Sequence, residues 1–258
     1  MAEYNERVLR IGLPKGSLNS EDPNRGNTNE LLLRAGYDIV GYNPGREQPS
    51  VLSIKNDPEL KLKLIRPQSA PYDALPRRKL DIAIIGGDWV VDAQSLKKPI
   101  QVIGELGYGN VSVVVAVPQN FPYDSLTDFF NSRRGNSNPA ICHTEYVNLT
   151  SDYIRKNKGY QSLFGLLAPL IVMRGHNIGK NSFVQVHFSD GLTESFLEEG
   201  DEFIVDNLHT GNTLKGYGGR PLETIIESSA VVCAGPSCVD WKKDKSAEFF
   251  ERLGKARQ

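Results

Sequence analysis

The residues best suited to chemistry lie together in residues 203–214, which read FIVDNLHTGNTL. An apolar run ends in Asp206, and a Thr-Gly-x-Thr pattern follows it. Gly211 allows the backbone to turn so that several N–H groups converge on one anion, while Thr210 and Thr213 add hydroxyl donors. A helix beginning near Thr213 would point its positive end at the same anion. Because Asp206 can accept hydrogen bonds from vicinal ribose hydroxyls, the segment suits a 5-phosphoribosyl group.

The same segment also has a purely structural interpretation. In a strand–turn–helix, Asp206 and Thr210 would only cap a helix. A strand followed by Thr-Gly-x-Thr is a weak motif by itself, so both interpretations stay open on these residues alone. His209 lies inside the turn and is a further candidate for contacting a substrate. The other histidines show no metal-ligand spacing, and we expect them to be structural: His143, His176 and His187.

Short β-branched runs alternate with longer amphipathic segments around this site, a rhythm that predicts an α/β protein with largely parallel sheets. Asn27 or Thr28 can cap the first helix, and Gly36 can end it. We expect helices over residues 27–35, 71–79, 149–156 and 244–255, and a loop-rich stretch over 118–138. Strands are expected over residues 8–13, 61–66, 81–85, 110–117, 140–142, 184–188, 202–205 and 222–234.

Two long strand-like segments, near residues 108–117 and 223–234, flank the middle third of the chain. Such paired strands often carry a chain into a second domain and back. We therefore expect two lobes, each a mixed sheet flanked by helices. The first lobe would hold residues 1–110 and 225–258, and the second would hold residues 111–224 with the Asp206 segment. The ligand is expected in a cleft between them, where the C-terminal ends of strands open.

Composition excludes several classes of protein. The chain has 30 basic and 31 acidic residues, without the basic excess of a protein that holds nucleic acid. No stretch approaches the roughly 20 apolar residues of a membrane helix, and the polar N-terminus lacks the apolar run of a signal peptide. The three cysteines, Cys142, Cys233 and Cys238, suit a reducing cytosol and give no zinc spacing. We expect a cytoplasmic protein without nucleic-acid or membrane partners and without a metal site of its own.

Five segments, taken in order, resemble one known family. Residues 204–214 resemble the phosphoribosyl-pyrophosphate loop of the ATP phosphoribosyltransferases, an apolar-Val-Asp-Leu-Val-Ser-Thr-Gly-x-Thr-Leu string. The other four are residues 9–18 (LRIGLPKGSL), 66–91 (with LDIAIIG), 106–118 (LGYGNVSVVVAVP) and 227–230 (ESSA). A weaker likeness joins residues 144–153 (TEYVNLTSDY) to the family's T-K-Y-P-N-L segment. The resemblance covers about residues 8–235.

The resemblance implies a two-lobed fold of the periplasmic-binding-protein type and a reaction. N1 of the adenine of ATP would join C1 of the ribose of phosphoribosyl pyrophosphate, with inversion and release of pyrophosphate, as the first step of histidine biosynthesis. The transition state would be dissociative, so the enzyme would mainly position two anionic substrates. Mg²⁺ would bridge the pyrophosphate through substrate oxygens and water.

The resemblance also assigns roles to residues. Asp206 would hold the ribose hydroxyls, and Thr210, Gly211, Asn212 and Thr213 would hold the 5-phosphate. Lys15 and Arg66, each at the end of a strand, would face the pyrophosphate or triphosphate, although an ordinary solvated charge is the default for any single basic residue. Tyr72 would line the base pocket or serve packing only.

Several positions depart from the family pattern and keep alternatives open. Ser17 stands where the family usually has Arg, and Ser69 stands where its acidic residue falls. The chain therefore fits a divergent ATP phosphoribosyltransferase, a paralogue with another acceptor, or a non-catalytic ligand-binding protein of the same fold. The residues after Ala234 are too few for the regulatory domain of long family members. We expect a homo-oligomer, or a chain served by a separate regulatory subunit.

Overall fold

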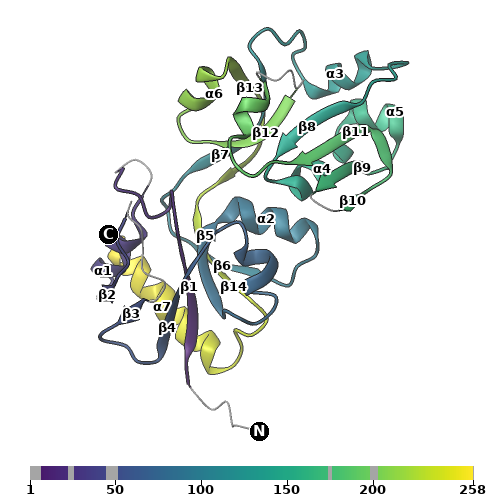
Figure 1. Cartoon of the computed structure of the whole chain (residues 1–258). Helices are drawn as coiled ribbons and strands as arrows, with labels where there is room; N and C mark the ends of the chain where they lie inside the picture. Colours follow the sequence, from purple (N-terminus) through teal and green to yellow (C-terminus); the bar gives the residue numbers. More distant parts are fainter. Residues whose placement is uncertain (1–6, 23–25, 45–51, 174–175, 198–202, 258) are drawn as a thin grey trace. The chain divides into compact units, whose positions relative to one another are not determined.

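The computed structural model describes residues 7–22, 26–44, 52–173, 176–197 and 203–257. The chain forms two compact units (Figure 1). Unit 1 holds residues 1–110 and 228–258, and unit 2 holds residues 111–227. Each unit is a mixed β-sheet flanked by helices, which confirms the expected fold class. The expected lobe boundary at residue 224 lies inside one strand, β13 (Gly219–Ser228), which continues to the end of unit 2.

Unit 1 is built on a five-stranded sheet of order β4-β1-β5-β14-β6. β1 lies parallel to both β4 and β5, whereas β14 lies antiparallel to β5 and β6. The C-terminal ends of β4, β1 and β5 therefore open at one edge of the sheet. The strands are β1 (Leu9–Pro14), β4 (Leu60–Ile65), β5 (Ile82–Gly86), β6 (Gln101–Glu105) and β14 (Ala230–Ala234), and a two-stranded ribbon joins β2 (Ile39–Val40) to β3 (Ser53–Ile54).

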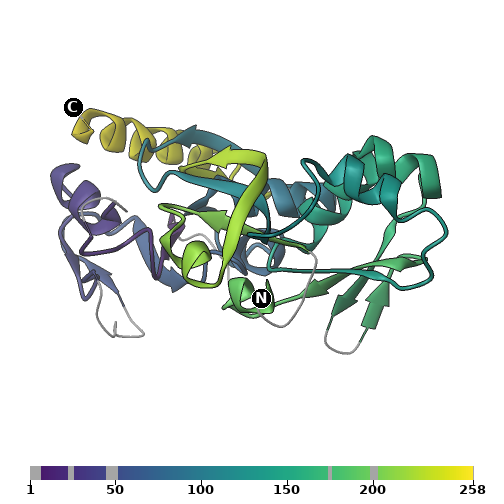
Figure 2. The same cartoon turned by 90° about the horizontal axis from the view of Figure 1, so that it is seen from above.

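Two helices share one hydrophobic core with the unit 1 sheet. α1 (Thr28–Arg34) contributes Leu31 and Leu32, and α7 (Trp241–Ala256) contributes Phe249 and Leu253. Both views show α7, drawn in yellow, running along the sheet (Figures 1 and 2). The Asn27 side chain accepts a hydrogen bond from the N–H of Glu30, so the expected N-cap of α1 is confirmed. The expected C-terminal helix is also confirmed.

The remaining helices of unit 1 differ from expectation. The helix expected over residues 71–79 is one π-helical turn, η1 (Ala70–Ala74), with Pro71 in its first turn. α2 (Gly87–Ser95) follows β5 directly and was not expected, because its Gly-Gly start suggests a turn. Gly86 is extended at φ −68° and ψ 138° and serves as the N-cap, so the first glycine ends the strand while the second begins the helix.

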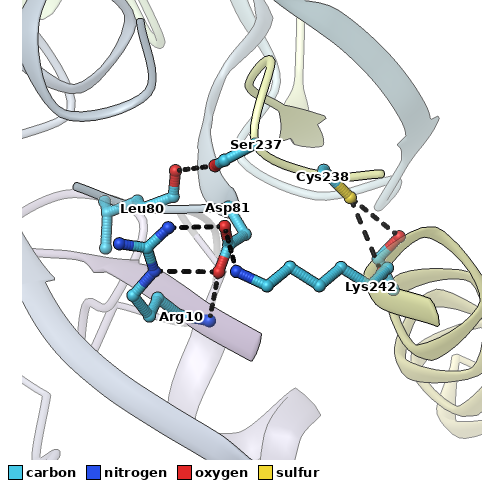
Figure 3. Close-up of polar contacts among 7 residues, drawn as sticks. Arg10, Leu80, Asp81, Ser237, Cys238 and Lys242 are labelled. Atoms are coloured by element: carbon cyan, nitrogen blue, oxygen red, sulfur yellow. Dashed lines mark hydrogen bonds and ion pairs between the residues drawn. The ribbon is translucent and has the colours of Figure 1, made fainter. Parts of the chain in front are cut away.

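A buried ion cluster ties the N-terminal ends of the unit 1 strands to α7 (Figure 3). Asp81 is fully buried and accepts from Arg10 Nη2 at 2.7 Å, from Arg10 Nε at 3.0 Å and from Lys242 Nζ at 2.9 Å. Burial opposes ionisation of Asp81, but the hydrogen bonds from Arg10, Ser237 and Lys242 outweigh it and lower the pKa. The cluster fixes where α7 begins against β1 and β5.

Unit 2 is built on a seven-stranded sheet of order β10-β9-β11-β8-β12-β7-β13. β9, β11, β8 and β12 run parallel, while β10 and β7 lie antiparallel to their neighbours β9 and β12. The strands besides β13 are β7 (Val111–Pro118), β8 (Ala140–Thr144), β9 (Pro169–Met173), β10 (His176–Ile178), β11 (Asn181–Phe188) and β12 (Phe203–Leu208). β7 is buried over Val113–Val117, as its apolar sequence predicts.

One face of the unit 2 sheet carries an aromatic core, and helices cover it. Phe203 of β12 meets the rings of Phe129 and Phe130 at centroid distances of 5.7 and 6.4 Å. These rings come from α3 (Leu126–Ser132), which lies in the stretch expected to be loop-rich, so that expectation is wrong. The helices on this unit are α3, α4 (Val147–Lys156), α5 (Lys158–Phe164), α6 (Asn212–Gly216) and the 3-10 turn η2 (Thr193–Leu197).

The strand expected over residues 222–234 is two strands. β13 ends at Ser228 and β14 begins at Ala230, because the chain passes from unit 2 into unit 1 there. The start of the strand expected over residues 202–205 lies outside the described residues, and β12 itself extends to Leu208. Among the helices of the described residues, none combines the length and apolar character needed to cross a bilayer.

Candidate functional site

In unit 1, two predicted basic residues leave the sheet from adjacent parallel strands. Pro14, the last residue of β1, lies opposite Ile65, the last residue of β4. Lys15 and Arg66 follow directly, and the N–H of Lys15 donates to the carbonyl of Ile65 at 3.0 Å. Both side chains are exposed. The structure therefore brings Lys15 and Arg66 to the same edge of the sheet, at the C-terminal ends of parallel strands.

A left-handed glycine and a buried tyrosine stabilise the turn that carries Lys15. Gly16 has φ +84°, a left-handed conformation that a side chain would strain. The buried hydroxyl of Tyr42 donates to the carbonyl of Pro14 at 2.9 Å. Burial raises the pKa of Tyr42 well above its ordinary value, so the hydroxyl keeps its proton and remains a donor at neutral pH.

The turn after Arg66 is closed by Ser69. Its hydroxyl donates to the Arg66 carbonyl at 3.0 Å, and its N–H donates to the same carbonyl at 3.0 Å. Ser69 occupies the place of the acidic residue in the family pattern, and here it closes a turn. Tyr72 lies next along the chain in η1 and is half-buried. Its role in a base pocket stays a prediction.

In unit 2, Asp206 lies on β12, opposite Val114 of β7, and is only 8% exposed. Its Oδ1 accepts the N–H of Asn207 at 2.7 Å. Burial, and after it the negative charges of Glu194 and Glu145, raise its pKa to about 8, while the hydrogen bond from the Asn207 N–H opposes the rise. Asp206 therefore keeps its proton near neutral pH and is hydrogen-bonded to the carboxyl of Glu194, and the two side chains form a carboxyl pair.

The segment after β12 has the predicted local conformation. Gly211 is left-handed at φ +72° and is the N-cap of α6. The helix begins at Asn212, one residue before the expected start at Thr213. A Cβ at Gly211 would meet nothing within 4 Å, so only the backbone conformation requires glycine. Thr210, Asn212 and Thr213 are exposed, which leaves their polar groups accessible to a ligand.

Sequence reasoning missed Glu194, although it lies beside Asp206. The N–H of Ser189 donates to the carbonyl of Thr144 at 3.0 Å, and the hydroxyls of Ser189 and Thr193 lie 2.8 Å apart. These bonds fix the chain just before Glu194 against the end of β8. The sequence signal is weak, because residues 191–194 (GLTE) only loosely resemble the Gly-Ser-Val-Glu segment of the family, and their spacing to Asp206 is uncertain by one residue.

A cavity of about 340 Å³ opens beside the same loop, entirely within unit 2. Its walls come from the end of β12, the loop, α6, β7 and β13. Lys215 of α6 and Arg220 of β13 are the charged residues in its lining, and neither was predicted as a site residue. The lining residues are Ser112, Val114, Gln119, Leu208, His209, Thr210, Gly211, Lys215, Gly219, Arg220, Pro221 and Thr224.

The predicted residues thus form two groups. Lys15, Arg66 and Tyr72 belong to unit 1, and the first two share a sheet edge. Asp206 and residues 210–213 belong to unit 2. There Asp206 pairs with the carboxyl of Glu194, and residues 210–213 form the turn that leads into α6. Within the described residues there is no group of three or more His, Cys, Asp or Glu side chains that could hold a metal ion.

Comparison with known proteins gives concordant results. Residues 73–255 match the family model HisG, described as ATP phosphoribosyltransferase. The ATP phosphoribosyltransferase of Chlorobium phaeovibrioides is 29% identical over 247 residues, covering 93% of this chain and 68% of the relative. That of Thermodesulfovibrio yellowstonii is 29% identical over 254 residues, covering 95% and 70%.

Solved structures share the fold. The ATP phosphoribosyl transferase (HisG:HisZ) complex from Thermotoga maritima has a TM-score of 0.66 at 18% identity, covering 97% of this chain and 98% of that one. The periplasmic aliphatic sulphonate binding protein SsuA from Escherichia coli has a TM-score of 0.52 at 13% identity, covering 97% and 68%. These likenesses confirm the two-lobed, periplasmic-binding-protein-like fold.

Proposed function

The chain belongs to the ATP phosphoribosyltransferase family, a family of pentosyltransferases, and on that premise we propose its reaction. It joins N1 of the adenine of ATP to C1 of the ribose of phosphoribosyl pyrophosphate and releases pyrophosphate, as the first step of histidine biosynthesis. One observation carries the proposal. Asp206 is the last buried residue of β12, and a left-handed Gly211 between the exposed Thr210 and Asn212 follows it, inside the range that matches the family model.

We propose that the loop holds the phosphoribosyl group. Thr210, Asn212 and Thr213 offer hydroxyl, amide and backbone donors to the 5-phosphate, and the left-handed Gly211 turns the backbone toward the anion. Asp206 accepts hydrogen bonds from the ribose hydroxyls. Burial and Glu194 keep this carboxyl protonated in the free protein, so substrate binding must favour its ionised form.

We propose that the basic residues of unit 1 face the other charges of the substrates. Lys15 and Arg66 end adjacent parallel strands and are exposed, so their cations are available to the pyrophosphate or the triphosphate. Bond breaking at C1 transfers negative charge to the departing pyrophosphate, and fixed cations stabilise that charge in the transition state. Adenine N1 attacks through its own lone pair, so the step requires no general base.

Mg²⁺ is proposed to enter with phosphoribosyl pyrophosphate. The chemistry of the residues fits, since the carboxylates of Asp206 and Glu194 are hard oxygen donors of the kind Mg²⁺ prefers. When bound, the ion neutralises charge on the pyrophosphate. Asp206 and Glu194 would be the residues that hold the ion together with the substrate.

We also propose a cytoplasmic protein that works as an oligomer, with a partner subunit as the further option. The Thermotoga maritima structure, which has the same fold, is a HisG:HisZ complex. Light scattering coupled to gel filtration tests this arrangement. A monomer that turns over by itself would count against both forms of assembly.

The proposed reaction is tested by pyrophosphate-coupled turnover with phosphoribosyl pyrophosphate and Mg²⁺, with and without ATP. We expect pyrophosphate release only when ATP is present. Asp206→Ala and Thr213→Ala should abolish turnover while the far-ultraviolet circular dichroism stays that of the wild type. Full activity in both variants would show that the loop is not part of the substrate site. Pyrophosphate release with a different base, but not with ATP, would show that the protein uses another acceptor.

A further inference from the structure

The turn that carries Lys15 is held at both of its ends by buried hydroxyl groups. At its start, the Tyr42 hydroxyl donates to the carbonyl of Pro14 at 2.9 Å. At its end, the carbonyl of Leu18 accepts two hydrogen bonds from Thr28, one from the N–H at 3.0 Å and one from the hydroxyl. Leu18 and Thr28 are both buried. Because the carbonyls on either side are fixed, the backbone between them has little freedom to move.

Tyr108 joins these hydroxyls from a distant part of the chain. Its hydroxyl lies 2.7 Å from Oγ1 of Thr28. Because the single hydroxyl proton of Thr28 is donated to Leu18, Tyr108 is the donor of this bond. Burial raises the pKa of Tyr108 well above its ordinary value, so the phenol keeps its proton at neutral pH. Thr28 also interacts with the hydroxyl of Tyr42, and the side chains of Tyr42, Thr28 and Tyr108 form one hydroxyl cluster.

The ring and backbone of Tyr108 are held independently of its hydroxyl. The N–H of Ala230, the first residue of β14, donates to the carbonyl of Tyr108 at 2.8 Å. The ring lies directly against Gly26, where a Cβ would come within 2.3 Å of Cδ2 of Tyr108. Gly107 and Gly109 on either side are both left-handed, at φ +68° and +66°. Loss of the hydroxyl alone therefore leaves the ring in its place.

The hydroxyl cluster bears on the proposed reaction through Lys15. The ammonium of Lys15 is offered to the polyphosphate of a substrate, and its long side chain magnifies any movement of the backbone that carries it. A turn that is already ordered lowers the entropic cost of binding, and a displacement of about 1 Å is enough to weaken the contact. Tyr108 lies in the segment that leads into unit 2, which begins at residue 111. The hydroxyl cluster therefore ties the turn to this segment.

We propose that Thr28 and Tyr108 are positioning residues for substrate binding. The chain of hydroxyls from Tyr108 through Thr28 to the carbonyl of Leu18 holds the turn in the conformation in which Lys15 binds a polyphosphate. The inference rests on the proposed function of Lys15. Thr28 and Tyr108 carry no charge and act through the turn, so their effect depends on the presence of the Lys15 ammonium.

Isothermal titration with ATP alone and with phosphoribosyl pyrophosphate alone, each with Mg²⁺, measures affinity without turnover. Lys15→Met should weaken one of the two substrates about tenfold, and that substrate is the one whose phosphates Lys15 meets. Tyr108→Phe keeps the ring and removes the hydroxyl, so it should weaken the same substrate about fivefold. Thr28→Val removes the hydroxyl that both Leu18 and Tyr108 use, and it should weaken that substrate about tenfold.

Two control variants accompany these substitutions. Thr28→Ser keeps the hydroxyl, so its affinity should stay within about twofold of the wild type. Tyr37→Phe is the matched tyrosine control, because Tyr37 is buried in the core of unit 1 and lies outside the hydroxyl cluster, and it should bind like the wild type.

The double variant Lys15→Met/Tyr108→Phe separates positioning from a general loss of structure. If Tyr108 acts through Lys15, its hydroxyl has little left to position once Lys15 is replaced, so the double variant should bind like Lys15→Met. A further fivefold loss in the double variant would show a merely structural effect and overturn the proposal. Wild-type affinity in both Tyr108→Phe and Thr28→Val would overturn it as well. Unchanged affinity for both substrates in Lys15→Met would instead refute the proposed role of Lys15 itself.

Discussion

Replacing Asp206 with asparagine should stabilise the protein at alkaline pH while it removes activity. Burial first, and the charge of Glu194 second, raise the pKa of Asp206 from 3.8 to about 8. At about 1.4 kcal/mol per pH unit, this displacement corresponds to a ceiling of about 6 kcal/mol for ionising the carboxyl in the folded protein. The amide of asparagine is still a polar group in a buried position, so the substitution recovers only part of that free energy, and we expect about 2 kcal/mol.

The pH window follows from the two pKa values. In the unfolded chain Asp206 loses its proton near pH 4, whereas in the folded protein it keeps the proton up to about pH 8. The folded state therefore binds more protons between these limits, and its stability falls as the pH rises through them. Asp206→Asn lacks this dependence. The stability advantage of the variant should be small near pH 5 and largest near pH 9.

Thermal unfolding at pH 5, 7 and 9 measures the effect. A gain of about 2 kcal/mol at pH 9 corresponds to a rise in Tm of about 4–8 °C for a chain of this size. Turnover should be lost at every pH, because the amide cannot replace an ionised carboxylate toward the ribose hydroxyls. An Asp206→Asn variant that is less stable than the wild type at pH 9 would refute the carboxyl pair. A variant that keeps its turnover would refute the role of Asp206 in ribose binding.

Three further substitutions test other parts of the account. Glu194→Gln removes the neighbouring negative charge, so the pH profile of kcat/KM for phosphoribosyl pyrophosphate should move to lower pH, and an unmoved profile would place Glu194 outside the pair. Gly211→Ala places a side chain at φ +72°, where the only cost is the backbone strain of about 1–2 kcal/mol, because the space around Gly211 is open. Tm should fall by about 2–8 °C and KM for phosphoribosyl pyrophosphate should rise, whereas an unaltered KM would argue against a loop that must keep this conformation. Asp81→Asn leaves Lys242 without its buried counter-ion and should cost about 3–5 kcal/mol of unfolding free energy in chemical denaturation, whereas a cost below about 1 kcal/mol would show that the cluster does not hold α7.

The sequence predicts best those features that depend on neighbouring residues. Gly211 can be predicted as a turn residue from its near neighbours in the sequence, the apolar strand before it and the threonines around it. Its left-handed backbone agrees with that prediction. The N-cap at Asn27 is predictable for the same reason, because its partner, the N–H of Glu30, is only three residues away. Lys15 and Arg66 were each placed at strand ends from local pattern, and the parallel pairing of β1 with β4 then brings them to one edge.

The features that escaped prediction depend on distant segments. Glu194 is brought to Asp206 because the N–H of Ser189 donates to the carbonyl of Thr144 at the end of β8 and the hydroxyl of Ser189 is hydrogen-bonded to that of Thr193. The cavity combines β7, β12, α6 and β13, so its cations become neighbours only after the sheet has formed. Helix α3 had a readable pattern that the Pro- and Asn-rich surroundings obscured, namely an N-cap at Ser125 followed by buried residues at i, i+3 and i+4: Leu126, Phe129 and Phe130.

The central claim is that this chain transfers a phosphoribosyl group to N1 of ATP, and mass spectrometry of the product tests it most directly. The purified chain is incubated with ATP, phosphoribosyl pyrophosphate and Mg²⁺, with Asp206→Ala as the matched inactive control. We predict one new species with the mass of ATP plus a phosphoribosyl group, whose fragments carry the ribose on N1 of adenine, and none in the control. The absence of this species from wild-type reactions, while phosphoribosyl pyrophosphate binds and is consumed with another acceptor, would contradict the account.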